Sequence, residues 1–147
     1  MEAWELNQQK KDYLNGYRDA KRREKLLCEQ IQQLRLDTMF PCLQGDGMPR
    51  GSGQSDLSDY MARYDDLMEE LHQEAIRAKK EYEEIHRAVR WMKDEEEKEI
   101  LTRKYLMRQT WEKIAKETGM SRRTAIRIHG NALKNFKIPK VGTPWHS

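Results

Sequence analysis

The most constraining feature of the sequence is an uninterrupted apolar repeat over residues 57–92. Apolar side chains recur there in alternating steps of four and three residues. An average spacing of about 3.5 residues is typical of an α-helix that winds around a partner helix in a left-handed supercoil. The repeat therefore predicts one long helix whose apolar stripe forms a packing seam rather than a ligand site. It consists of Leu57, Met61, Tyr64, Met68, Leu71, Ala75, Ala78, Tyr82, Ile85, Val89 and Met92.

The partner helix is expected in the first part of the chain, over residues 4–36. That segment contains no proline and a single glycine, Gly16, and its apolar residues also follow a helical spacing. Residues 41–58 contain four glycines, two prolines and three serines, so they predict a loop, with Ser55 or Ser58 capping the next helix. The economical arrangement is an antiparallel, coiled-coil-like hairpin. Two hairpins could then pair as a four-helix homodimer.

Composition supports an all-α protein. Charged residues make up 36% of the chain and the apolar set AVILMFWYC only 37%, while valine occurs only at Val89 and Val141. These values favour long, largely exposed helices and argue against a sandwich, a barrel or a doubly wound sheet. No apolar run approaches the about 20 residues that cross a bilayer, and the first residues lack the apolar core of an export signal. We therefore expect a soluble, cytoplasmic protein with no membrane partner.

The cysteines and histidines indicate no chemical site. Cys28 and Cys42 lack zinc-site spacing and are expected to be reduced thiols, Cys28 in a helix interface and Cys42 in a loop. The four histidines are scattered, without carboxylates at metal-ligand spacing, so no metal or other cofactor is expected. No nucleophile–base set or phosphate-binding loop is present, and an enzyme is not expected.

Positive charge is concentrated in the last third of the chain. Residues 58–99 hold 8 Lys/Arg and 14 Asp/Glu, or −6, whereas residues 100–147 hold 11 Lys/Arg and 2 Asp/Glu, or +9. Residues 1–57 are balanced, and the whole chain has a net charge of only +3. A basic segment on a nearly neutral protein indicates a phosphate-bearing partner, most simply nucleic acid.

The basic segment begins with a short helix expected over residues 95–106. Asp94 is placed to cap it, and three glutamates occupy its first turn, where the helix dipole favours negative charge. We interpret these glutamates as helix-capping residues and not as a catalytic carboxylate cluster.

Residues 110–136 then show the pattern of a helix-turn-helix. Thr110 is placed to cap one helix, Gly119 to end it in a turn with positive φ, and Ser121 to cap a second helix over residues 121–136. Small and apolar residues stand where the two helices of such a unit must cross closely. These packing residues are Ile114, Ala115, Met120, Ala125, Ile128, Ala132 and Phe136.

The second helix carries its basic residues on the side opposite its packing residues. Helical geometry directs Arg123, Arg127 and Lys134 away from the packing side. Arginine and asparagine can pair with guanine and adenine edges in the major groove, which admits an α-helix. The side chains expected to contact DNA are Arg122, Arg123, Thr124, Arg127, Asn131 and Lys134 on this helix, with Lys113, Lys116 and either Arg103 or Arg108 contacting phosphates.

Residues 94–136, DEEEKEILTRKYLMRQTWEKIAKETGMSRRTAIRIHGNALKNF, resemble region 4 of sigma-70 family factors. The fuller resemblance is to phage and prophage regulators of the RinA and ArpU late-transcription type, and MPRGSGQSDLSDY at residues 48–60 is similar to a motif in one group of them. The resemblance implies a transcription regulator that binds promoter DNA in a bacterial cytoplasm, and it leaves contact with RNA polymerase open. It does not imply a complete sigma factor, since no promoter-melting module is present.

The sequence thus predicts three parts: a helical hairpin and oligomerisation region at residues 1–93, a DNA-binding domain at 94–138 and a flexible tail at 139–147. A DNA-packaging adaptor resembling a small terminase subunit is the alternative, because such proteins also join a helix-turn-helix to oligomerising helices. A ring larger than a dimer would favour that alternative. A basic face that binds an acidic protein surface is a further alternative.

Overall fold

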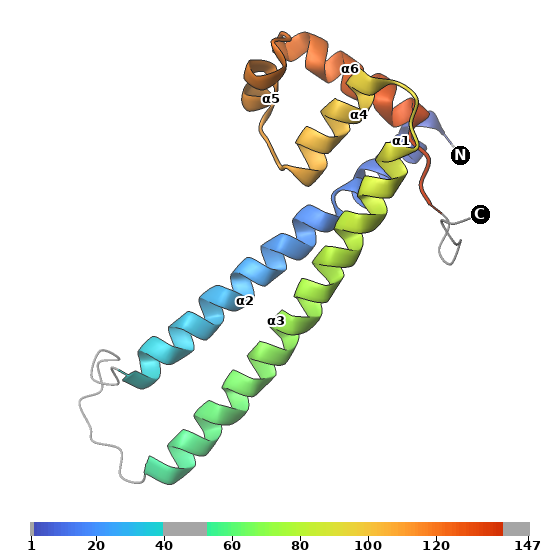
Figure 1. The fold of residues 1–147 in the computed structure, drawn as a ribbon. Helices are drawn as coiled ribbons and strands as arrows, with labels where there is room; N and C mark the ends of the chain where they lie inside the picture. The colour runs from blue at the N-terminus through green and yellow to red at the C-terminus, as the bar shows by residue number, and fades with distance from the viewer. Residues whose placement is uncertain (1, 40–52, 140–147) are drawn as a thin grey trace. The chain divides into compact units, whose positions relative to one another are not determined.

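The computed structural model describes residues 2–39 and 53–139, and the helices in these ranges are shown in Figure 1. No β-strand occurs in the described residues, which confirms the all-α prediction. No described helix has both the length and the apolar character needed to cross a membrane. In chain order the elements are α1 (Ala3–Leu14), α2 (Gly16–Met39), α3 (Gly53–Arg90), α4 (Glu95–Leu101), the π-helical turn η2 (Thr102–Leu106), α5 (Trp111–Thr118) and α6 (Arg122–Asn135).

The helices divide into two compact units. Unit 1 combines the chain up to Asp19 with the chain from Ala78 onward, and unit 2 is Ala20–Arg77. Both long helices, α2 and α3, run through the point of division. The three-part organisation expected from the sequence stays a prediction, and its tail, beyond residue 139, lies outside the described residues.

Unit 2 is formed by the larger part of α2 and the first part of α3. The Arg23 Nε lies 3.0 Å from the Glu74 Oε2, and the Arg35 Nη2 donates to the Tyr64 hydroxyl over 3.1 Å. These two contacts place the early part of one segment beside the late part of the other. Several apolar side chains nevertheless remain exposed in unit 2: Leu26, Leu36, Met39, Leu57, Met61, Met68 and Ile76.

Three expectations for unit 2 need correction or lie outside the structure. Cys28 is exposed and not in a helix interface. The preceding Leu27 is buried, and successive side chains of a helix point about 100° apart. The loop expected over residues 41–58 is too long, since α3 already begins at Gly53 and Ser55 and Ser58 are therefore inside the helix. Each residue added to an existing helix gains a backbone hydrogen bond, which outweighs the weak turn preference of a segment without proline. Cys42 lies outside the described residues.

The single helix expected over residues 4–36 is instead two helices. Asn15 separates α1 from α2, with its N–H bonded to the Lys11 carbonyl and its own carbonyl bonded to the Asp19 N–H. Backbone hydrogen bonding thus continues through the break. The break falls at an asparagine followed directly by Gly16, and both residue types have a low helix propensity.

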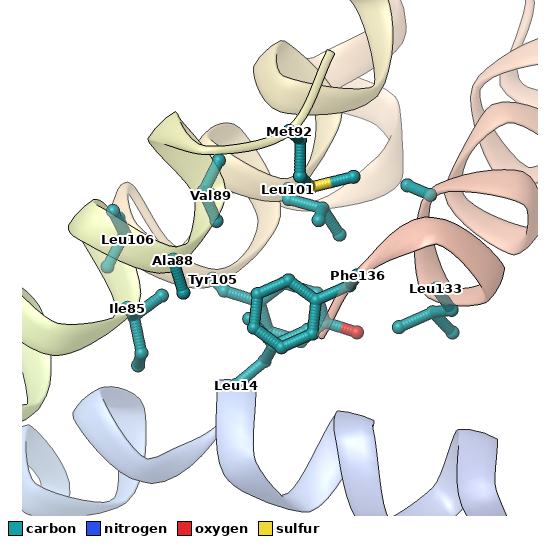
Figure 2. Close-up of a cluster of buried hydrophobic side chains, with 11 residues drawn as sticks. Leu14, Ile85, Ala88, Val89, Met92, Leu101, Tyr105, Leu106, Leu133 and Phe136 are labelled. Carbon is teal, nitrogen blue, oxygen red and sulfur yellow. The ribbon is translucent and has the colours of Figure 1, made fainter. Parts of the chain in front are cut away.

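Unit 1 is built around an apolar cluster to which α1, α3, α4, η2 and α6 all contribute. Figure 2 shows Phe136 at the centre of this cluster, with labelled side chains from α1, α3, α4, η2 and α6 around it. Phe136 and Leu14 are both fully buried, and the Tyr13 ring packs at 6.1 Å from the Phe136 ring. The cluster comprises Leu14, Ile85, Ala88, Val89, Met92, Leu101, Tyr105, Leu106, Ala132, Leu133 and Phe136.

The helix that follows Asp94 also differs from expectation at its end. Asp94 caps α4 as predicted, accepting from the Glu97 N–H over 3.0 Å, and the acidic run occupies the first turn. The helix does not remain α-helical to residue 106, because η2 widens into a π-turn in which the Met107 N–H bonds to the Thr102 carbonyl at 2.9 Å. The wider turn accompanies burial of both Tyr105 and Leu106 in the core of unit 1.

Candidate nucleic-acid interface

Helix α5 begins and ends at the residues predicted from the sequence. The Thr110 hydroxyl accepts from the Lys113 N–H over 3.2 Å and so satisfies one of the free donors at the helix start. Gly119 has φ 74° and its N–H bonds to the Ala115 carbonyl at 3.0 Å. Glycine favours this left-handed conformation because it has no Cβ, and the turn toward α6 depends on it.

Helix α6 begins at a second side-chain cap. The Ser121 hydroxyl accepts from the Thr124 N–H over 3.1 Å and also bonds to the Thr124 hydroxyl at 2.9 Å. Both predicted caps, Thr110 and Ser121, are therefore confirmed. Thr124 is engaged in its own helix cap, so its hydroxyl is less available to a ligand than the sequence suggested.

An apolar cluster holds α5 and α6 together and connects them to α4. Ile114 of α5 and Ala125 of α6 are fully buried, and they pack with Ile100 and Ile128. Met120, in the turn, packs against the same cluster. The side of α6 predicted to pack is thus the side that is buried.

The two glycines of this region allow a matched test of the turn. A Cβ added at Gly119 or at Gly130 would meet no atom within 4 Å, so the two positions differ in backbone conformation and not in available space. Gly119→Ala is expected to lower the free energy of unfolding by about 1–2 kcal/mol, because alanine disfavours the left-handed region. Gly130→Ala lies within α6 and is expected to raise it by about 0.5–1 kcal/mol. Urea unfolding followed by circular dichroism measures both, and effects of the same sign would contradict the assignment of the turn.

The basic residues predicted to contact DNA lie on the outside of α5 and α6. Arg123, Arg127 and Lys134 are exposed, and their side chains form no hydrogen bond or ion pair with another described residue. Asn131 is exposed in the same row, and Lys113 and Lys116 are exposed on α5. Arg122 differs, since its Nη1 lies 3.5 Å from the Glu112 Oε1 of α5. Both partners of that pair are largely exposed, so it restrains Arg122 only weakly.

The two arginines considered for phosphate contact next to η2 have different surroundings. The Arg103 Nε forms an ion pair with the Glu99 Oε1 at 3.0 Å, and its Nη1 contacts the Gln109 amide oxygen at 3.5 Å. Arg108 is exposed and has no such partner among the described residues, and its guanidinium lies 5.9 Å from the centre of the Tyr17 ring. Of the two arginines, Arg108 is therefore the one whose guanidinium is free to contact a phosphate.

Two polar contacts that hold α6 were missed by sequence reasoning. The buried Lys10 ammonium of α1 donates to the carbonyls of Leu133 at 2.7 Å and Lys134 at 3.3 Å, near the negative end of the α6 dipole. Burial lowers the pKa of Lys10. The Asn135 amide donates to the buried Glu97 carboxylate at 3.0 and 3.1 Å. No spacing rule links residues so far apart in sequence, although a Lys in an otherwise apolar helix position was a signal available for Lys10.

His129 is a buried residue of α6 with a defined partner. Its Nε2 lies 2.7 Å from the Tyr105 hydroxyl, and the Trp111 ring packs edge-on against the imidazole with centroids 5.2 Å apart. Burial first, and then the charges of Lys11 and Lys104, lower the pKa of His129 to about 4. The imidazole is therefore neutral at physiological pH, and its Nε2 shares a hydrogen bond with the Tyr105 hydroxyl.

The described residues contain no group of three or more His, Cys, Asp or Glu side chains that could hold a metal ion. Helices α5 and α6 therefore present exposed cations on their outer side and are held together by an apolar cluster on their inner side. No family model, curated protein or solved structure matches the chain.

Proposed function

We propose that the protein is a sequence-specific duplex-DNA-binding transcription regulator of phage or prophage origin that acts in a bacterial cytoplasm. In this proposal α5, the turn at Gly119 and α6 form a helix-turn-helix similar to sigma-70 region 4, and α6 enters the major groove. The observation that carries the proposal is the row of exposed, unpartnered Arg123, Arg127 and Lys134 on the face of α6 opposite its buried side. This observation concerns DNA alone and leaves contact with RNA polymerase open.

The distribution of charge along α6 supports an anionic partner. The helix contains no acidic residue, and two arginines, Arg122 and Arg123, stand in its first turn. Cations are unfavourable there because the amino end of a helix carries partial positive charge. A phosphate at this end would interact favourably with both the arginines and the free N–H groups.

The side chains in the row also suit base recognition. Arg127 can donate two hydrogen bonds to guanine, and Asn131 can pair with adenine through its amide. Gly130, between them in the sequence, has open space where a side chain would be and would let the backbone approach the groove. Lys113 and Lys116 are on α5, where they would contact phosphates and set the register of α6.

A homodimer forms part of the proposal. The exposed apolar residues of unit 2, among them Leu57, Met61 and Met68 of α3, would be covered by the same face of a second copy. A dimer would contain two copies of α6.

The test compares three single variants, Arg123→Ala, Arg127→Ala and Lys113→Ala, on duplexes selected by the parent protein from a random-sequence pool. We expect each arginine variant that has lost a base contact to bind the selected duplex about 1–3 kcal/mol more weakly, with a much smaller loss on scrambled DNA. Lys113→Ala should weaken binding to both duplexes by similar amounts, since phosphates carry no sequence information. Fluorescence anisotropy at two salt concentrations measures these affinities.

Two controls belong to this titration. Circular dichroism tests whether each variant remains folded. Light scattering measures the mass of the parent protein in solution and so shows whether it is a dimer. Unchanged affinity in both arginine variants would contradict the assignment of α6 as the recognition helix and would favour an acidic protein partner. A monomeric mass would contradict the dimer alone.

A further inference from the structure

Unit 1 carries a second group of cations, separate from the row on α6. It consists of Lys11 of α1, Arg18 at the start of α2, Lys104 of η2 and Arg108 just after η2, and we call it the η2 cluster. The Lys104 ammonium lies 4.8 Å from the centre of the Trp111 ring, and the Arg108 guanidinium lies 5.9 Å from that of Tyr17. Aromatic faces thus hold two of the cations in place.

The η2 cluster contains four cations, and the carboxylates found beside it are those of Asp19, next to Arg18, and Glu81, against Gly16. Among the described residues, the Arg18 Nη2 forms an ion pair with the adjacent Asp19, at 3.5 Å, and the buried Arg18 Nε has no hydrogen-bond partner. Lys104 forms no hydrogen bond or ion pair with a described residue, and Glu112, whose charge acts on Lys104, is paired with Arg122. Burial and the charge of Arg18 both lower the pKa of Lys104, as expected for a cation that lacks an anionic partner.

Arg108 occupies a backbone position that does not favour it. Its φ is 55°, and it is the only described residue other than glycine with a positive φ. The Gln109 N–H bonds back to the Arg103 carbonyl at 3.0 Å, so Arg108 stands where glycine commonly ends a helix. A glycine would form this turn with less strain, which indicates that the arginine side chain has a use of its own.

The cluster borders the proposed DNA interface at two points. Trp111, whose ring lies against the Lys104 ammonium, is the first residue of α5 and is two residues from Lys113. Lys10, next to Lys11 in α1, bonds to the carbonyls of Leu133 and Lys134 at the end of α6. The cluster is therefore fixed to the same rigid support as α5 and α6.

We propose that Lys104 and Arg108, with Lys11 and Arg18 beside them, bind backbone phosphates of the same duplex, outside the base pairs that α6 contacts. The inference rests on the proposed function and extends it, because α1 and η2 then lengthen the DNA footprint. Phosphodiester oxygens suit the cluster because it presents several cations without a shape that would select a particular base.

The experiment measures the salt dependence of DNA binding for Arg108→Gly and for the double variant Lys104→Gln/Arg108→Gly. Each lost phosphate contact should lower the slope of log affinity against log salt by about 0.9. The loss of affinity across a fourfold increase in salt then shrinks about 3-fold for Arg108→Gly and about 10-fold for the double variant. The unfolding midpoint of Arg108→Gly should equal or exceed that of the parent, because glycine accepts the left-handed backbone.

Arg103→Gln is the matched control, since Arg103 is in the same turn but is paired with Glu99. It should leave the salt slope unchanged. Parent-like slopes in Arg108→Gly and in the double variant, on a duplex from which Arg127→Ala has lost affinity, would overturn the inference and leave the proposed function intact. A parent protein that binds no duplex would overturn both, and a selective loss of binding to an acidic polypeptide would assign the cluster to a protein partner instead.

Discussion

Replacing Phe136 by alanine is expected to lower the free energy of unfolding of unit 1 by about 3–5 kcal/mol, the largest effect of any single change considered for this protein. Phe136 is the largest fully buried side chain, and it follows directly after α6. Its ring contacts a cluster supplied by five elements, so its removal leaves a cavity that no single helix can fill by moving (Figure 2). Small domains are stable by only about 5–15 kcal/mol, so a large part of the stability would be lost.

Urea unfolding followed by circular dichroism measures this loss. Phe136→Leu keeps most of the apolar volume and should cost clearly less than Phe136→Ala. Ile126→Ala is the control on α6, because Ile126 is 42% exposed and its truncation should cost little. An unfolding free energy for Phe136→Ala close to that of the parent would contradict the assignment of this cluster as the core.

The local features of α5 and α6 could be predicted from the sequence because each depends on a few neighbouring residues. Thr110, Ser121 and Asp94 act as caps within three residues of the N–H groups they bind. The positive φ of Gly119 follows from the same local logic, and the burial of Ala125 and Ile128 follows from helical periodicity.

The contacts that fix α6 on its support could not be predicted in this way. Lys10 binds carbonyls 123 and 124 residues further along the chain, and Glu97 binds an amide 38 residues away. Such pairs depend on the tertiary arrangement, for which the sequence pattern gives no spacing. The π-turn at η2 is of the same kind, because it accompanies the burial of Tyr105 and Leu106 and has no propensity signal of its own.

Acidification between pH 6.5 and 4 is expected to destabilise unit 1 by about 3 kcal/mol through His129 alone. Its pKa is lowered from 6.5 to about 4, first by burial and then by the charges of Lys11 and Lys104. The unfolded chain therefore binds a proton that the folded protein excludes, and stability falls as the pH drops through this range. The size follows from about 1.4 kcal/mol for each pKa unit. Well above pH 6.5 neither the folded nor the unfolded state binds this proton, so His129 no longer makes the stability depend on pH.

His129→Gln isolates this contribution from the carboxylates that titrate over the same range. Glutamine can still bond to the Tyr105 hydroxyl, which lies 2.7 Å from the His129 Nε2, because its amide both donates and accepts, but it takes up no proton. We expect the unfolding free energy of the parent to decline more steeply than that of the variant between pH 6.5 and 4, while the two curves run parallel above that range. Parallel curves throughout would mean that the imidazole titrates normally. His129 could not then be a neutral buried link between η2 and α6, and the support of α6 would depend on Lys10, Glu97 and the apolar cluster around Phe136 without it.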